Sequence, residues 1–110
     1  MTSRMSHAVI DHVNAAQDRL IAARLRRDRR ALRIARQNLR RWMARDGRKV
    51  RPVFHEWHGI LVRLNAREIA AFLESDTPMA RRLRQSSPFA GVLTEAERRA
   101  IQQKHEKARA

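Results

Sequence analysis

The 110-residue chain contains no cysteine and no tyrosine, and it has only three glycines, three prolines, two tryptophans and three phenylalanines. Without cysteine there is no disulfide framework, no thiolate metal site and no cysteine nucleophile. Three glycines are too few for a glycine-rich phosphate-binding loop. So few aromatic side chains also argue against a surface on which the bases of single-stranded nucleic acid would stack.

Long hydrophobic runs are absent as well. No stretch approaches the roughly 18 consecutive apolar residues that a membrane-spanning helix requires, and the first ten residues, MTSRMSHAVI, lack the apolar run of a cleaved signal. We expect a small cytoplasmic, bacterial protein with no membrane partner.

Positive charge is what the chain has in excess. It carries 25 basic and 11 acidic residues, for a net charge of +14. Thirteen of the basic residues lie between Arg24 and Arg51, where only Asp28 and Asp46 oppose them. Arginine outnumbers lysine by 22 to 3, which suits two-point contacts with phosphate and is equally what a GC-rich genome would encode. A charge this localised indicates a polyanionic partner and the segment that meets it.

Apolar spacing predicts one long first helix, beginning between Thr2 and Ala8 and ending at about Arg45, before the helix stop at Gly47. Its second half has coiled-coil character, interrupted by Asp28. Such a seam must be buried, either against the C-terminal helices or against a second copy in a homodimer. The residues of this apolar seam are Ile21, Leu25, Leu32, Ala35, Leu39 and Trp42.

The rest of the sequence predicts a compact module of about four short helices over residues 52–103, followed by a frayed tail over 104–110. No alternating run typical of a β-strand occurs, so the expected fold class is all-α: a long basic amphipathic helix with its exit loop over residues 1–51, then the module. Helix-start signals occur at Pro52, at Asn65 with Glu68, at Thr77 with Pro78, and at Thr94 with Glu97.

Arginines recur along the long helix at spacings of three and four, on a stripe away from the apolar seam. A partner's phosphates would relieve the repulsion among these guanidinium groups and release counterions. The alternative interpretation is a solvated charged face. The expected phosphate contacts are Arg26, Arg29, Arg30, Arg33, Arg36, Arg40, Arg41, Arg45, Arg48, Lys49 and Arg51.

Residues 67–74 and 78–85 have the helix, short turn and helix of a helix-turn-helix motif. The turn lacks the usual glycine, because Glu74 and Ser75 stand where a glycine and an apolar residue are expected. Two ordinary short helices of a bundle are therefore the alternative. If the motif is present, its second helix would read bases through Arg81, Arg82, Arg84 and Gln85.

No set of residues predicts catalysis. His55 and His58 have two residues between them where the zinc-protease helix has three, and no third ligand is near in sequence. They are expected at the polar edge of a buried Trp57. No serine has a histidine or aspartate placed by a readable motif to activate it. We therefore expect no enzyme, no metal ion and no cofactor.

These patterns favour a small basic nucleic-acid-binding protein that contacts the phosphates of DNA or RNA through its arginine-rich helix, with a helix-turn-helix-like DNA-binding regulator as the more specific form. The alternative is a protein-interaction subunit, of toxin-neutralising or accessory type, that docks an acidic partner through the long helix. In that case Asp28, among the leucines, would set the docking register.

Overall fold

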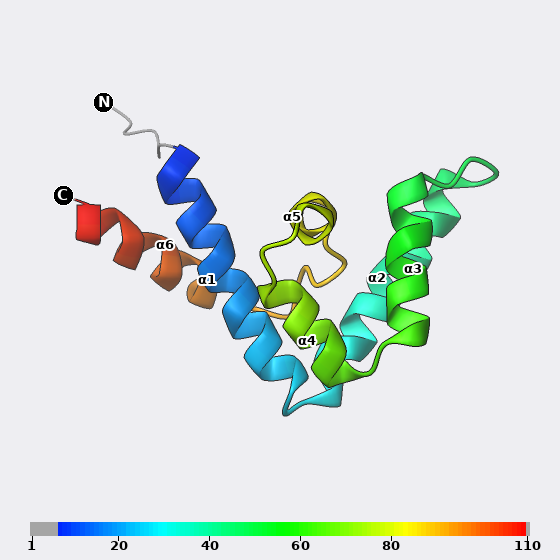
Figure 1. The fold of residues 1–110 in the computed structure, drawn as a ribbon, viewed down its shortest axis with the longest axis horizontal. Helices are drawn as coiled ribbons and strands as arrows, with labels where there is room; N and C mark the ends of the chain where they lie inside the picture. Colours follow the sequence, from blue (N-terminus) through cyan, green and yellow to red (C-terminus); the bar gives the residue numbers. More distant parts are fainter. Residues whose placement is uncertain (1–6, 110) are drawn as a thin grey trace.

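The computed structural model describes residues 7–109, and this part of the chain forms six α-helices and no β-strand (Figure 1). The all-α class expected from the sequence is confirmed. The helices are α1 (His7–Leu25), α2 (Arg29–Asp46), α3 (Pro52–Arg63), α4 (Ala66–Glu74), α5 (Pro78–Arg84) and α6 (Glu95–Arg109).

The expectation of one continuous first helix is wrong. The chain leaves the helical path after Leu25 and begins a second helix at Arg29. Asp28 has an extended backbone, with φ −137° and ψ 114°, and its carboxylate accepts a hydrogen bond from the backbone N–H of Arg30 at 2.8 Å. Asp28 is thus the N-cap of α2. Figure 1 shows α1 and α2 diverging from this turn like the arms of a V.

The other helices fill and flank this V. α4 packs along α1, α3 packs along α2, and α6 packs on α1, while α5 follows α4 near the centre of the molecule (Figure 1). Both capping boxes expected from the sequence are present, at Asn65 with Glu68 and at Thr94 with Glu97. α6 extends to Arg109, whereas the sequence predicts that this helix ends near residue 104.

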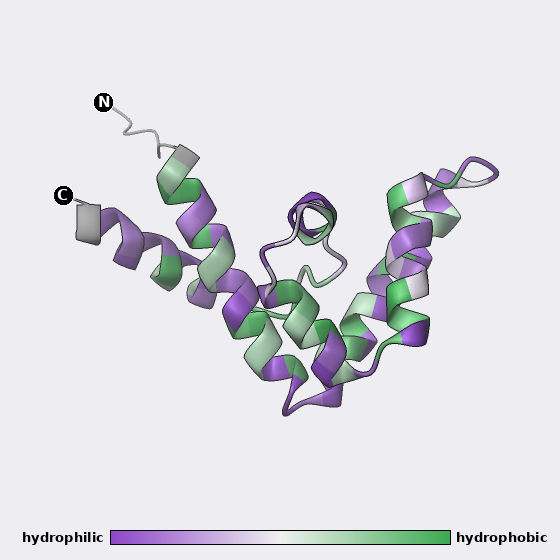
Figure 2. Ribbon diagram, viewed as in Figure 1, coloured by the Kyte–Doolittle hydropathy of each residue, from purple (hydrophilic) through white to green (hydrophobic). Residues whose placement is uncertain are grey.

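Trp57 of α3 lies at the centre of the core. Its side chain is fully buried, and its ring meets Phe72 and Phe89 edge-on, with ring centroids 5.8 and 6.0 Å apart. Its indole Nε1 donates a hydrogen bond to the carbonyl oxygen of Leu83 at 2.9 Å. One tryptophan therefore joins α3 to α4, to α5 and to the segment before α6. Figure 2 shows hydrophobic colouring on the middle helix α4, whereas the turn between α1 and α2 is hydrophilic.

The apolar seam is buried inside the chain's own core. Ile21, Leu25, Ala35 and Leu39 are buried, and the partly buried Leu32 and Trp42 pack against the same cluster. This cluster takes residues from both sides of residue 51, so the long-helix region and the helical module share one core. A homodimer formed through the seam would have to displace these internal contacts.

The N-cap at Asp28 generates a test of the helix break. Asp28→Ala removes the acceptor for the Arg30 N–H and should lower the free energy of unfolding by about 1 kcal/mol. Asp28→Asn loses the same charge but keeps a capping oxygen, so its free energy of unfolding should stay within a few tenths of a kcal/mol of the parent. Urea denaturation followed by circular dichroism measures both; equal losses in the two variants would show that charge, not capping, matters here.

Candidate nucleic-acid interface

α2 has one buried face and one basic face. Its buried residues are Ala31, Ala35, Asn38 and Leu39. At about 100° of rotation per residue, the exposed arginines cover roughly the opposite half of the helix circumference. These exposed arginines are Arg29, Arg30, Arg33, Arg36, Arg40, Arg41 and Arg45.

The arginines form two flanks on this face. Arg29, Arg33, Arg36 and Arg40 fall within an arc of about 60°, and we call them the basic row. On the opposite flank, about 80° or more away from most of the row, lie Arg30, Arg41 and Arg45. The exposed residues along the middle of the face are Gln37 and Ala44.

No carboxylate neutralises the basic row. Within residues 7–109, none of its four arginines forms an ion pair, and neither do Arg30, Arg45, Arg48 and Lys49. The two acidic residues that border α2 are otherwise engaged: Asp28 caps the helix, and Asp46 accepts from the backbone N–H of Arg51 at 3.0 Å and pairs with its side chain. Like charges at these spacings repel each other, so the row stores unfavourable electrostatic energy that bound anions would remove.

Three other arginines of the basic segment are tied to the fold. Arg24 forms a two-point hydrogen-bonded ion pair with Glu97 and also donates to the carbonyl oxygen of Val92 at 3.1 Å. Arg26, expected in the phosphate-contacting stripe, lies in the turn and pairs with Glu74 at 2.5 Å. Arg51, also expected there, pairs with Asp46 and lies over the ring of Phe54.

The break at Asp28 also shortens the stripe. From Arg29 to Arg45 the helix rises about 24 Å at 1.5 Å per residue, whereas a continuous helix from Arg24 would have risen about 32 Å. Arg41 remains on the exposed face, where its guanidinium donates to Oδ1 of Asn38. Of the expected contact set, the residues that remain exposed and outside any ion pair of the described chain are Arg29, Arg30, Arg33, Arg36, Arg40, Arg41, Arg45, Arg48 and Lys49.

Three of the four side chains proposed for base reading form ion pairs or hydrogen bonds with other residues of the chain. Arg81 pairs with Asp76 at 2.9 Å, and Arg82 makes two hydrogen bonds to Glu56, at 2.9 and 2.6 Å. Arg84 is partly buried and donates to the carbonyl oxygens of Leu73 and Ser75.

Of the four residues in that set, Gln85 is the one whose side chain is exposed and makes no hydrogen bond or ion pair within residues 7–109. The helix that carries them, α5, is only seven residues long. We therefore leave α5 out of the candidate surface.

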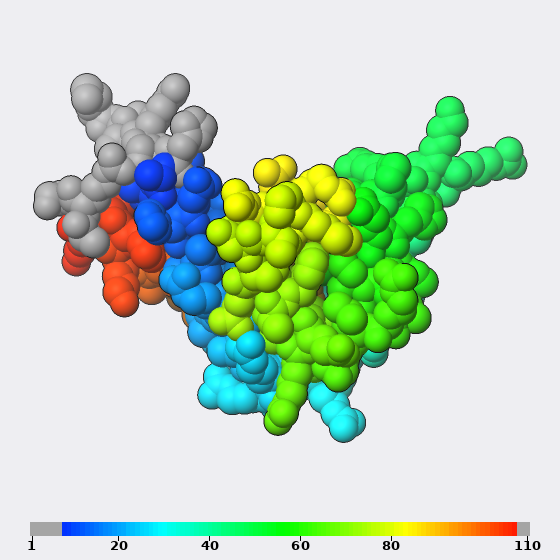
Figure 3. All heavy atoms as spheres, in the orientation of Figure 1, coloured from blue at the N-terminus to red at the C-terminus, as the bar shows by residue number. Residues whose placement is uncertain are grey.

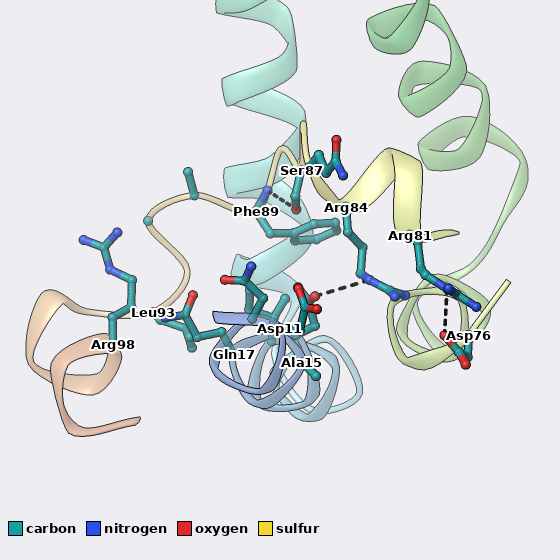
Figure 4. Close-up of a pocket in the computed structure, with 16 residues that line it drawn as sticks. Asp11, Ala15, Gln17, Asp76, Arg81, Arg84, Ser87, Phe89, Leu93 and Arg98 are labelled. Atoms are coloured by element: carbon teal, nitrogen blue, oxygen red, sulfur yellow. Dashed lines mark hydrogen bonds and ion pairs between the residues drawn. The ribbon is translucent and has the colours of Figure 1, made fainter. Parts of the chain in front are cut away.

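A second site, which the sequence did not indicate, is an open pocket of about 730 Å³ between α1, α5 and the segment before α6 (Figures 3 and 4). Asp18 lies in it, with its Oδ2 3.5 Å from Nε of Arg84. Burial raises the pKa of the Asp18 carboxyl from 3.8 to about 6, and the Arg84 guanidinium only partly opposes this shift. The two residues are 66 positions apart, so no local pattern could have revealed the pair.

The histidines show no metal site. His55 and His58 are exposed on α3, on either side of the buried Trp57. Over residues 7–109, no group of three or more histidine, aspartate or glutamate side chains is arranged to hold a metal ion. The sequence also gave no sign of the stacked rings of His12 and His105, whose centroids are 6.3 Å apart.

Comparison of the chain with protein-family models, with curated proteins and with solved structures found no match. None of the helices in the described range is both long and apolar enough to cross a membrane. The interpretation of the two sites therefore depends on their own geometry.

The raised pKa of Asp18 predicts an unusual pH dependence of stability. Between pH 6 and pH 3.8 the folded chain holds a proton on Asp18 that the unfolded chain releases, so the free energy of unfolding should rise as the pH falls through this window. The gain is on the order of 2 kcal/mol, after allowing for solvent at the open side of the pocket.

The carboxyl of Glu97 does not titrate in the same pH window. The Arg24 guanidinium lowers the pKa of Glu97 to about 2, so the stability that Glu97 contributes is lost only below pH 4.5.

Urea denaturation of Asp18→Asn at pH 4, 5, 6 and 7 tests this, because the variant should lose the gain between pH 6 and pH 4. Asp11→Asn, at an exposed position on the same helix, is the control with an equal change of charge. This variant should keep the gain in the free energy of unfolding between pH 6 and pH 4. An Asp18→Asn profile that parallels the parent between pH 4 and pH 6 would contradict the assignment.

Proposed function

We propose that this chain binds nucleic acid by contacting phosphates with the exposed arginines of α2. The observation that carries the proposal is the basic row together with its second flank: seven exposed arginines on one helix, of which none pairs with a carboxylate among the described residues. Guanidinium groups bind phosphate in a two-point geometry. Each neutralised phosphate also releases condensed counterions, which drives association.

The fold presents this face on a rigid support. Ala31, Ala35 and Leu39 anchor α2 in the core. Asn38 adds a polar anchor, because its Nδ2 donates to the carbonyl oxygens of Pro88 at 2.9 Å and Ala90 at 2.7 Å. The helix is therefore ordered before a partner arrives, so binding does not have to bear the entropic cost of forming it.

The alternative function, a subunit that docks an acidic protein, receives less support. It requires a long helix that lies along an acidic partner, with Asp28 among the leucines of the apolar seam marking the docking register. In the fold the seam lies in the chain's own core, and Asp28 caps α2. An acidic protein would have to bind the arginine face without an apolar centre, whereas protein interfaces usually have one.

The salt dependence of binding tests the proposal. For a fluorescently labelled 20-base-pair duplex, fluorescence anisotropy should show the logarithm of affinity falling with the logarithm of salt concentration at a slope of about −5, if six phosphates are neutralised. Changing Arg29, Arg33, Arg36 and Arg40 together to Gln should make the slope shallower by about 0.9 for each phosphate that the variant no longer neutralises. Circular dichroism should show the same helical content as the parent.

A matched control changes four exposed basic residues on other helices, Arg67, Arg98, Lys104 and Lys107, to Gln. These side chains form no ion pair within residues 7–109, so net charge falls equally while the ion pairs of the fold stay intact. The control should keep most of the slope. A flat salt response in the parent, or equal changes of slope in the two quadruple variants, would overturn the proposal.

A further inference from the structure

We infer, on the basis of the function proposed above, that α2 docks lengthwise in the major groove of duplex DNA. Gln37 and Ala44 would face the base edges, and the arginines on each side of them would reach the two phosphate backbones. Two observations lead to this docking mode: the arrangement of residues around α2 and the dimensions of nucleic-acid grooves.

The exposed face of α2 is basic on both flanks and uncharged along part of its middle. The basic row lies on one flank, and Arg30, Arg41 and Arg45 lie on the other. Gln37 and Ala44 fall between the two flanks, on the side opposite the buried residues. A helix that rested against a single strand of phosphates would need basic residues on one flank only. Charge on both flanks fits a helix with phosphates on both of its sides.

The width of α2 decides which groove of a nucleic-acid duplex can hold it. An α-helix with its side chains is about 10–12 Å across, and the major groove of B-form DNA is about 12 Å wide, whereas the minor groove is about 6 Å wide. The major groove of A-form RNA is too narrow and deep for protein side chains to read. Among duplexes, the groove that admits α2 with both flanks at phosphates is therefore the DNA major groove.

The residues along the middle of the face suit this placement. Every residue on the two flanks and along the middle is exposed, so no other helix covers the face. Alanine at position 44 lets the helix approach the bases closely and can contact a thymine methyl group, and a glutamine such as Gln37 can make two hydrogen bonds to adenine. Because base contacts would be so few, discrimination between sequences should be modest.

The first test compares a 20-base-pair DNA duplex with an RNA duplex of the same sequence, using the full chain at one salt concentration. Groove docking predicts at least tenfold tighter binding of the DNA. Methyl green, which occupies the major groove, should displace the protein, and netropsin, which occupies the minor groove, should not. Equal or tighter binding of the RNA, or displacement by netropsin alone, would overturn the inference.

The second test places bulk in the middle of the face without changing charge. Ala44→Trp should weaken binding to the DNA duplex about tenfold while leaving the salt slope unchanged, because the phosphate contacts on the flanks remain. Ala100→Trp, at an exposed position of α6, is the matched control and should bind like the parent. Equal affinities for the two variants would also overturn groove docking.

The nucleic-acid function and groove docking fail in different ways. If the parent protein binds none of the duplexes, or if its affinity is insensitive to salt and to the arginine substitutions, both are overturned. If binding keeps its dependence on salt and on the basic row but RNA, netropsin or Ala44→Trp gives the contrary result, only groove docking is overturned.

Discussion

The chain turns between α1 and α2 at Asp28, whose carboxylate accepts a hydrogen bond from the Arg30 N–H and caps the start of α2. A continuous helix from α1 to α2 would hold the apolar seam along a single line. With the turn in place, α1 packs against α4 and α6 while α2 packs against α3, and one core gathers residues from both arms. The exposed orientation of the basic row follows from this arrangement, because α2 turns its apolar side toward that core.

Two sets of arginines in this chain have different physical roles. Arg24, Arg82 and Arg84 bridge elements that are distant in sequence, through Glu97, Glu56 and Asp18 respectively. Each has an acceptor from its own chain, so each contributes to the fold. The arginines of the basic row have none among the described residues and are held apart only by helix geometry. They add repulsion to the folded state that the packing of the buried side of α2 must offset.

Much of the local structure could be predicted because its causes are local. The capping boxes at Asn65 and Thr94 depend on residues three positions apart, and both form as expected. The break at Asp28 was missed because apolar residues recur with a seven-residue period on both sides of it. The pattern of hydrophobic residues suggested continuity, yet aspartate is also among the best N-caps. In this chain Asp28 caps the start of a second helix, although the seven-residue apolar period continues across it.

The sequence by itself determined the helical class, the caps and the concentration of arginines on one helical face, because these depend on residue type and on a period of 3.6 residues. Only the tertiary structure decided that the apolar seam is buried within the chain and that Arg26 and Arg84 bond to other parts of the fold. Only the tertiary structure, too, placed Asp18 in a pocket where burial raises the pKa of its carboxyl. These outcomes depend on which distant segments meet. That choice is made by packing around Trp57 and within the V of α1 and α2, and it leaves no trace in local spacing.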